Sequence, residues 1–322
     1  MNIYIIGSGT FGTAIANSLA KNLNNNVTLY SRSQKIVDDI NNNNFNTKYF
    51  PNTKLNTKIK ATNDPERVSG HEFVFLAIPS SAIKECLNNF KYKISNEQII
   101  INLSKGIFNN GQTITDYLAS FFDNKNIVSL KGPSFAIEIM ENAKTLLTLA
   151  CAEKFLFEKI SKLFLKTNIF LDYTNDIKGV EVLSVIKNIY ALFMGVIDAK
   201  YNSHNTRFMF MTKVFSEIRM LNNNLGGNEN TLFLSCGLGD VCLTSLNDLS
   251  RNRTLGLLIG KGFYESNSKD NTVVIEGLNS VKTIYNMIDQ KLVSDFPILS
   301  KLHFYLNSNE KRFNIDVKEF LA

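Results

Sequence analysis

The glycine-rich turn GSGTFG at residues 7–12 constrains the fold of this chain more than any other feature of the sequence. It follows a short β-rich run and passes without a break into a helical pattern, which is the context that a dinucleotide-binding turn requires. Gly7 permits the tight turn, Gly9 lets the backbone approach a pyrophosphate, and Gly12 lets the helix lie against the strand. The N–H groups at the start of that helix add donors for an anion. The turn therefore predicts a Rossmann-like unit that binds a dinucleotide.

β-rich runs alternate with segments of helix length through the first half of the chain, and the β signals vanish from residue 177 onward. Alternation of this kind predicts a mostly parallel sheet with helices on both faces. We therefore expect an α/β Rossmann-like N-terminal domain over residues 1–176 and an all-α C-terminal domain over residues 177–322. The expected strands are Ile3 to Ile6, Val27 to Tyr30, Phe73 to Ile78, Gln98 to Asn102, Ile127 to Leu130, Thr145 to Ala150 and Ile169 to Tyr173, and the expected long helices are Val180 to Ala199 and Arg207 to Leu221.

Length and composition agree with this organisation and exclude several classes of protein. At 322 residues the chain is longer than the ~250–300 residues at which one hydrophobic core stops growing. A net charge of +6 without dense basic blocks argues against nucleic-acid binding. The four cysteines form no CxxC pair and the three histidines stand far apart, so we expect no metal site.

The apolar runs argue against a membrane span. The longest strongly apolar run, Asn188 to Ile197, is shorter than the roughly 18 to 20 residues that a span requires. The first residues read as a strand and a glycine turn, without the pattern of a signal peptide. We expect a cytoplasmic protein with no stable membrane insertion. The asparagine-rich tracts at residues 22–26, 41–44 and 222–224 are predicted to be surface loops, because asparagine tolerates turn conformations.

The end of the second expected strand bears on the choice of cofactor. NAD-selective proteins usually place a carboxylate there, but this chain has Tyr30-Ser31-Arg32-Ser33. An arginine pairs with the 2′-phosphate of NADP and stacks on adenine, so Arg32 favours NADP, or the use of both cofactors, slightly. The alternative is an exposed arginine that contacts nothing.

Lys187 is the candidate catalytic residue. It lies in a run from Val182 to Phe193 that is apolar on nearly every helical face, so the helix is expected to be buried. Burial lowers the pKa of a lysine toward the range where it gives and takes a proton at neutral pH. A cationic lysine also stabilises the negative charge that hydride delivery builds on a carbonyl oxygen. The alternative is a lysine whose stem is buried and whose head reaches the surface.

Two further groups of residues point to an anionic substrate. Residues 236–244 (CGLGDVCLT) are followed by SRNR at residues 250–253, where Arg251 and Arg253 stand at the start of an expected helix. A fork of donors beside free N–H groups makes an anion pocket, although a solvated basic face would have the same sequence. In the first domain, Ser104-Lys105-Gly106 and Gly132-Pro133-Ser134 follow strands at the edge where such sheets bind ligands.

Taken together, GSGTFGTA, SKG, GPSFAIE, KNIYAL, GLGD and SRNR occur in an order that resembles the NAD(P)-dependent glycerol-3-phosphate dehydrogenase family of the bacterial type, over nearly the whole chain. The resemblance implies that Lys187 is the proton donor and acceptor, with Lys105 also at the substrate. It implies further substrate contacts at Gly132, Ser134, Asp240, Thr244, Ser250, Arg251 and Asn252. Cofactor contacts beyond the three glycines are implied at Thr10, Phe11, Arg32, Lys105, Ala136, Arg251, Val274 and Glu276.

The same resemblance implies the interconversion of dihydroxyacetone phosphate and sn-glycerol 3-phosphate with NADP or NAD, a step that supplies glycerophospholipid synthesis. Two other readings stay open on the residues alone. A 3-hydroxyacid or ketopantoate-type dehydrogenase also pairs a Rossmann domain with a helical one and uses a lysine. A non-catalytic NADP sensor would bind the cofactor without turnover. The long apolar helical domain favours a homodimer.

Overall fold

The computed structural model describes residues 1–264, 276–308, 310 and 312–320, and it divides into two compact units. The sheet unit comprises Met1–Lys105 and Ile114–Ile177. The helical unit comprises Gly106–Thr113 and Lys178–Ala322. Gly106–Thr113, which lies within the first expected domain, thus groups with the second unit.

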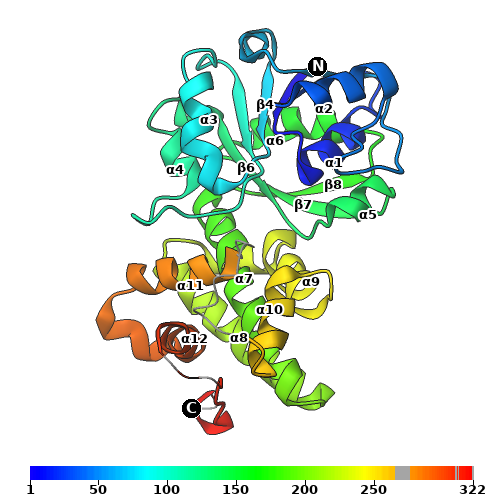
Figure 1. Cartoon of the computed structure of the whole chain (residues 1–322). Coiled ribbons are helices and arrows are strands. Elements are labelled where there is room, and N and C mark those ends of the chain that lie inside the picture. The colour runs from blue at the N-terminus through cyan, green and yellow to red at the C-terminus, as the bar shows by residue number, and fades with distance from the viewer. Residues whose placement is uncertain (265–275, 309, 311, 321–322) are drawn as a thin grey trace. The chain divides into compact units, whose positions relative to one another are not determined.

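A sheet forms the centre of the sheet unit (Figure 1). It has eight strands in the order β3-β2-β1-β4-β5-β6-β7-β8. Neighbouring strands are parallel except β6 and β7, which are antiparallel. The mostly parallel Rossmann-like sheet expected from the sequence is confirmed, and β3 is a strand that the sequence reading missed. The strands are β1 Asn2–Ile6, β2 Asn26–Tyr30, β3 Ile59–Thr62, β4 Phe73–Leu76, β5 Ile99–Asn102, β6 Ile127–Lys131, β7 Thr145–Ala150 and β8 Ile169–Thr174.

Helices cover both faces of this sheet. Successive side chains along β1 point to opposite faces, and apolar side chains are buried against helices on each face. Ile3 and Ile5 pack in the core that also contains Ile15 of α1. On the other face, the ring centroid of Tyr4 lies 6.2 Å from that of Phe90 in α3. The helices are α1 Thr10–Leu19, α2 Gln34–Asp38, α3 Ile83–Phe90, α4 Ile114–Leu118, α5 Ala136–Met140 and α6 Lys154–Ser161, with a π-helical turn at Asp39–Asn43 and 3₁₀ turns at Pro65–Gly70, Ser80–Ala82, Asn124–Asn126 and Lys162–Phe164.

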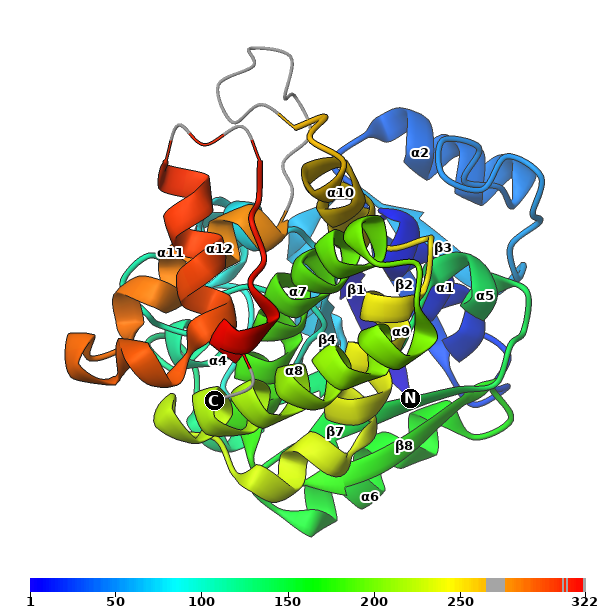
Figure 2. The ribbon, with the colours of Figure 1, turned by 90° about the horizontal axis from the view of Figure 1, so that it is seen from below.

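The helical unit is built around α7, Ile177–Lys200, which is buried along nearly its whole length. Figures 1 and 2 show α7 among the other helices of this unit. Its length and apolar composition would also suit a membrane span, but its most apolar stretch is entirely buried, as in a core helix. The all-helical domain is confirmed for the part of the chain that the structure describes. The other helices are α8 His204–Asn224, α9 Asp240–Leu246, α10 Arg251–Gly260, α11 Glu276–Met287 and α12 Pro297–Asn307, with a π-helical turn at Ser235–Gly239 and 3₁₀ turns at Glu229–Phe233, Gln290–Asp295 and Val317–Phe320.

The prediction that the asparagine-rich tracts are surface loops is wrong for several of their residues. Asn22, Asn25 and Asn222 are almost completely buried, and residues 222–224 belong to α8. The side-chain Nδ2 of Asn25 donates to the carbonyls of Leu19 and Leu163 at 2.9 and 2.8 Å. These amides satisfy main-chain carbonyls where helices end, which a buried helix end requires.

A buried carboxylate, Glu217 of α8, joins the core helix to the start of α12. It accepts hydrogen bonds from the Tyr190 hydroxyl at 3.1 Å and from the N–H groups of Ile298 and Leu299 at 2.9 Å. Those N–H groups belong to the first turn of α12, so Glu217 serves as a cap from another helix. Burial nevertheless raises the pKa of Glu217 to about 7, against the lowering effect of the donors.

This pKa predicts that the helical unit loses stability as the pH rises from about 4.5 to 7. In that window the carboxyl of the folded protein holds its proton, whereas that of the unfolded protein has released it. The release favours the unfolded state, so the free energy of unfolding falls as the pH rises. The loss attributable to this group is about 3 kcal/mol. Denaturant unfolding of the wild type and of Glu217→Gln at several pH values measures it, because the variant lacks the titration. Glu229→Gln, at an exposed site, is the matched control. Parallel stability curves for wild type and Glu217→Gln would contradict the prediction.

Candidate functional site

The glycine turn of the sheet unit has the geometry expected from the sequence. Gly7 has a φ of +119°, and a Cβ there would stand 2.4 Å from the carbonyl oxygen of Ala77. A Cβ on Gly12 would stand 1.9 Å from the carbonyl oxygen of Gly7, so α1 and the turn approach too closely for any side chain. A Cβ on Gly9, by contrast, would meet no atom within 4 Å. The open space beside Gly9, at the N-terminus of α1, fits the pyrophosphate of a dinucleotide.

The end of β2 carries hydroxyl groups and an arginine. Ser31 is buried, and its Oγ accepts hydrogen bonds from the Ser8 hydroxyl at 2.8 Å and from the N–H of Ser33 at 3.2 Å. The Arg32 side chain is 76% exposed and lies 3.6 Å from an equally exposed Glu85 carboxylate. An ion pair this exposed is weak, so the guanidinium can leave the Glu85 carboxylate and bind a phosphate. Of the other expected cofactor contacts, Thr10 and Phe11 open α1 and Ala136 opens α5.

The turns after β5 and β6 lie at one edge of the sheet, because these strands are parallel neighbours with Asn102 opposite Ser129. The Asn102 side chain accepts from the N–H of Ser104 at 2.9 Å and donates to the Ser104 carbonyl at 3.2 Å, which fixes the turn that carries the half-buried Lys105. After β6, the Ser134 hydroxyl donates to the carbonyl of Gly132 at 3.0 Å. The structure thus places Lys105, Gly132 and Ser134 beyond the carboxyl ends of two parallel strands, the edge at which such sheets typically bind ligands.

A buried cation stands at the centre of the helical unit. The Nζ of Lys187 lies 2.5 Å from the Oδ1 of Asp240 and 3.0 Å from the Oγ1 of Thr244. The side chains of Lys187 and Asp240 are only 5% and 1% exposed. Thr244 stands one helical turn after Asp240 on α9, with its hydroxyl 3.4 Å from the same carboxylate oxygen. The burial expected for Lys187 is present, and its head is held inside the unit rather than at the surface.

The first residues of α10 are tied to the residue that follows Lys187. Asn252 donates through Nδ2 to the Oδ1 of Asn188 at 3.0 Å and accepts through Oδ1 from the N–H of Gly277 at 2.9 Å. Asn188 in turn donates to the Oε2 of Glu276 at 3.3 Å. Ser250 caps α10 by accepting from the N–H of Arg253, and Arg251 is exposed. Asn188 was missed in the sequence, where its only signal is its place beside Lys187.

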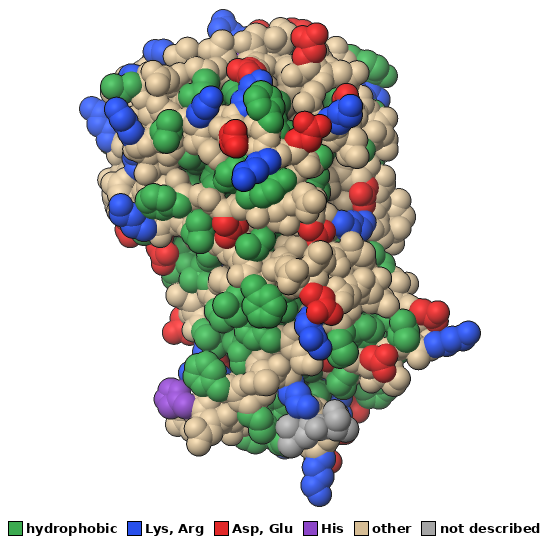
Figure 3. Space-filling model, turned by 180° about the vertical axis from the view of Figure 1, so that it is seen from behind, with side chains coloured by type: hydrophobic (Ala, Val, Ile, Leu, Met, Phe, Trp, Pro, Cys, Tyr) green, Lys and Arg blue, Asp and Glu red, His purple; other side chains and the backbone are tan. Residues whose placement is uncertain are grey.

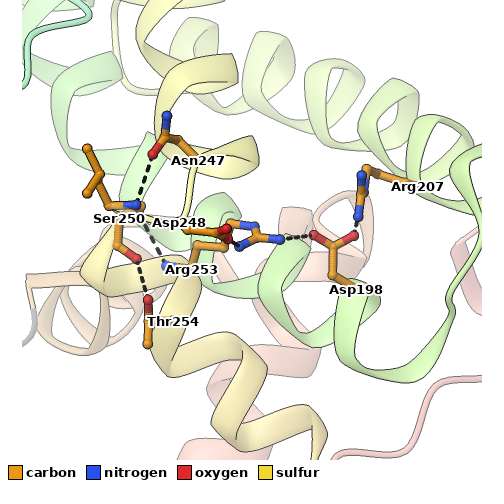
Figure 4. Close-up of polar contacts among 8 residues, drawn as sticks. Asp198, Arg207, Asn247, Asp248, Ser250, Arg253 and Thr254 are labelled. Atoms are coloured by element: carbon orange, nitrogen blue, oxygen red, sulfur yellow. Dashed lines mark hydrogen bonds and ion pairs between the residues drawn. The ribbon is translucent and has the colours of Figure 1, made fainter.

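Arg253 has a different role from the one expected of it. The sequence predicts that it shares an anion pocket with Arg251, but it is buried and pairs with carboxylates of the protein (Figure 4). Its Nη2 lies 2.8 Å from the Oδ2 of Asp198 at the end of α7, and its Nη1 contacts Asp248. Arg207 of α8 binds the other oxygen of Asp198 at 2.6 Å. The network joins α7, α8 and α10, so Arg253 positions the start of α10 and is already neutralised.

The structure therefore groups the expected site residues into two sets. One set belongs to the sheet unit and consists of Gly7, Gly9, Thr10, Phe11, Gly12, Arg32, Lys105, Gly132, Ser134 and Ala136. The other belongs to the helical unit and consists of Lys187, Asp240, Thr244, Ser250, Arg251, Asn252 and Glu276. Val274, an expected cofactor contact, lies outside the residues that the structure describes.

Comparisons with known proteins cover both units. The chain matches the family models described as NAD-dependent glycerol-3-phosphate dehydrogenase N-terminus, over residues 2–156, and C-terminus, over residues 176–315. It is 36% identical to a glycerol-3-phosphate dehydrogenase [NAD(P)+] of Clostridium botulinum, over 94% of this chain and 91% of that protein. It is 32% identical to the enzyme of the same name from Methanothermobacter thermautotrophicus, over 99% and 97%. The crystal structure of glycerol-3-phosphate dehydrogenase from Coxiella burnetii matches with a TM-score of 0.85 at 27% identity, over 96% and 95%.

Proposed function

The chain belongs to the NAD-dependent glycerol-3-phosphate dehydrogenase family, and from this membership we propose which residues carry the reaction. The family expected from the motifs is confirmed. The chain is an NAD(P)-dependent oxidoreductase that interconverts dihydroxyacetone phosphate and sn-glycerol 3-phosphate, a product used to build glycerophospholipids. The competing ketopantoate-type reading has less support.

We propose that the sheet unit binds the cofactor. Gly9 has the open space that a pyrophosphate needs, Gly7 and Gly12 form the turn around it, and Thr10 and Phe11 begin the helix behind it. Arg32 would face the 2′-phosphate of NADP at the end of β2, where Ser31 stands in place of a carboxylate. The bound nicotinamide supplies the hydride for carbonyl reduction and accepts it in the reverse direction. The remaining proposed contacts are Lys105, Ala136, Arg251, Val274 and Glu276.

We propose that Lys187 is the catalytic acid and base. In carbonyl reduction the ketone oxygen gains negative charge, and the Lys187 ammonium stabilises that charge and then gives its proton to the oxygen, which becomes the alcohol. In the reverse direction the neutral amine takes the proton from the alcohol. Asp240 and Thr244 hold Nζ at 2.5 and 3.0 Å, so the head of this long side chain has a fixed position. This buried and oriented lysine is the observation that carries the assignment.

We propose that Ser250, Arg251 and Asn252 bind the substrate phosphate. They lie at the N-terminus of α10, where backbone N–H groups and the helix dipole favour an anion. Arg251 is exposed, unlike Arg253, which is neutralised by Asp198 and Asp248. Among the residues that the structure describes, the Asn252 amide nitrogen donates to Asn188 alone, so its second hydrogen can donate to the phosphate. In the sheet unit, Lys105, Gly132 and Ser134 are also proposed to contact the substrate.

The test of the proposed function is turnover by the purified chain with each cofactor and each rival substrate. We expect oxidation of NADPH, and more slowly of NADH, when dihydroxyacetone phosphate is added. Arg32→Ala is expected to lower the ratio of kcat/KM for NADPH to that for NADH by about tenfold, because it removes a charge-assisted contact to the 2′-phosphate. A Lys60→Ala variant, on the exposed edge strand β3, is the control for a change in surface charge.

The other outcomes favour the rival readings. Turnover on ketopantoate but not on dihydroxyacetone phosphate would favour the hydroxyacid-type dehydrogenase. Cofactor binding with no turnover on either ketone would favour a sensor. A strong preference for NADH that is unchanged in Arg32→Ala would overturn the assignment of Arg32.

We propose that the chain acts in the cytoplasm as a homodimer through the helical unit. Figure 3 shows apolar side chains gathered over part of this unit. Exposed apolar residues of the helical unit include Phe208, Phe233, Phe263 and Phe304. Burying such groups against a second copy removes apolar surface from water. Light scattering of the purified chain measures the expected dimer mass.

A further inference from the structure

Asn46 lies outside every motif of the sequence, yet its side chain reaches the glycine turn of the cofactor site. It belongs to the loop between the π-helical turn at Asp39–Asn43 and β3, and it is completely buried. Its Nδ2 donates to the carbonyl oxygen of Ser8 at 3.0 Å and to the Oγ1 of Thr13 at 2.9 Å. One amide group therefore connects this loop to both ends of the turn.

The contact determines how one peptide plane is oriented. The Ser8 carbonyl accepts from Asn46 and also from the Thr13 hydroxyl at 3.2 Å, so it is held toward the protein interior from two sides. A trans peptide is planar, with its C=O and N–H pointing in opposite directions. The N–H of Gly9, in the same plane, must then point away from Asn46. A Cβ on Gly9, at the N-terminus of α1, would meet no atom within 4 Å, so the N–H points from a residue that has open space beside it.

Asn46 acts in this contact through its amide N–H groups and not through its amide oxygen. An amide nitrogen has two hydrogens, and the two contacts use both. The opposite orientation of the amide would place two oxygens against each other at the Ser8 carbonyl. The Oδ1 of Asn46 is buried without a partner among the residues that the structure describes, which costs free energy.

The loop that carries Asn46 is itself held in place. The carbonyl of Asn46 accepts from the N–H groups of Tyr49 and Phe50 at 3.0 and 2.8 Å, and the Phe50 side chain packs in the core of the sheet unit. The N–H of Leu55 donates to the carbonyl of Asn44 at 2.7 Å, which closes the loop. The side-chain amide is thus presented from a fixed backbone, as a positioning contact requires.

We propose that Asn46 is a positioning residue for cofactor binding, which orients the Ser8–Gly9 peptide so that the Gly9 N–H donates to the pyrophosphate. The proposal rests on the proposed function of the sheet unit. It predicts that loss of the Asn46 amide weakens the binding of every ligand that contains the pyrophosphate, whether or not the ligand also has a nicotinamide. It also predicts that the KM for dihydroxyacetone phosphate and kcat at saturating cofactor stay nearly unchanged.

The test compares Asn46→Ala with Asn25→Ala by calorimetric titration of NADPH and of ADP-ribose, which has the pyrophosphate but no nicotinamide. Asn25 is a matched control because it is also buried in the sheet unit, donates through Nδ2 to two acceptors and leaves Oδ1 unpaired among the described residues. We expect Asn46→Ala to raise the Kd of both ligands about tenfold, as for the loss of one oriented donor to a charged group. Asn25→Ala is expected to change them less than about twofold at a similar loss of thermal stability.

Thr13 supplies a second variant pair if Asn46→Ala does not fold. Thr13→Val keeps the shape of the side chain but removes the hydroxyl that donates to the Ser8 carbonyl, whereas Thr13→Ser keeps it. Weaker ADP-ribose binding in Thr13→Val and near-normal binding in Thr13→Ser support the proposal. Equal affinities in wild type, Asn46→Ala and Thr13→Val would overturn it. A wild type that binds neither NADPH nor ADP-ribose would instead overturn the proposed cofactor site, and the inference with it.

Discussion

Replacing Lys187 by methionine is expected to lower kcat by about 10⁴-fold, while the Kd for NADPH changes less than about twofold. The substitution removes both the proton that the carbonyl oxygen receives and the charge that stabilises the oxygen as it becomes an alkoxide. Methionine replaces the apolar stem of lysine and lacks only its terminal amine, so packing around α7 changes little. Steady-state kinetics with dihydroxyacetone phosphate and calorimetric titration of NADPH measure the two quantities.

The design must separate a catalytic loss from a loss of folding. Lys187→Met leaves the buried Asp240 carboxylate without the cation that lies 2.5 Å away, which is expected to destabilise the helical unit by about 3–5 kcal/mol. The double variant Lys187→Met, Asp240→Asn removes both charges and should regain most of that stability without regaining turnover. Lys282→Met, on an exposed face of α11, is the control and should keep wild-type kcat. Recovery of turnover in the double variant would contradict the role of Lys187.

Two alanine substitutions in the glycine turn are expected to weaken cofactor binding for different reasons. In Gly12→Ala the new Cβ would lie 1.9 Å from the carbonyl oxygen of Gly7, so α1 must move away from the turn. Because the obstacle is backbone, we expect a loss of about 3 kcal/mol or more in unfolding free energy, together with loss of cofactor binding. In Gly9→Ala the Cβ meets no atom within 4 Å and the φ of −71° suits alanine, so stability should be unchanged.

Gly9→Ala is nevertheless expected to raise the Kd for NADPH by about a hundredfold, because the methyl group occupies the space that the pyrophosphate needs. Denaturant unfolding and calorimetric titration of both variants test the pair. Gly70→Ala, at a glycine of the sheet unit where a Cβ also meets nothing, is the control for the loss of a glycine. Tight NADPH binding by a stable Gly9→Ala variant would show that the pyrophosphate lies elsewhere.

Most of the sheet was predictable from the sequence because its strands are buried on both faces and read as continuous apolar runs. β3 was missed for a physical reason. It is a four-residue edge strand, Ile59–Thr62, in which only Ile59 and Ala61 are buried and Lys60 faces solvent. It pairs with β2 alone, so neither its length nor its composition distinguishes it from a loop.

The roles of the two arginines in SRNR were not separable from the sequence. Arg251 and Arg253 have the same chemistry two residues apart, and positions two apart on a helix point to different sides. Arg253 faces Asp198 at the end of α7, and Arg251 faces solvent. The burial of an arginine depends on the helix packed against it, which local sequence does not specify.

The sequence by itself determined the dinucleotide turn, the change from alternating strands and helices to helices alone, and the burial of the helix that carries Lys187, since each of these depends on local spacing and residue type. Only the tertiary structure decided what surrounds those residues. Asp240 is 53 positions from Lys187 along the chain, and Asn46 is 38 positions from Ser8. Contacts over such separations form when the loops between them close and the core packs, so they depend on the whole fold and on no local pattern.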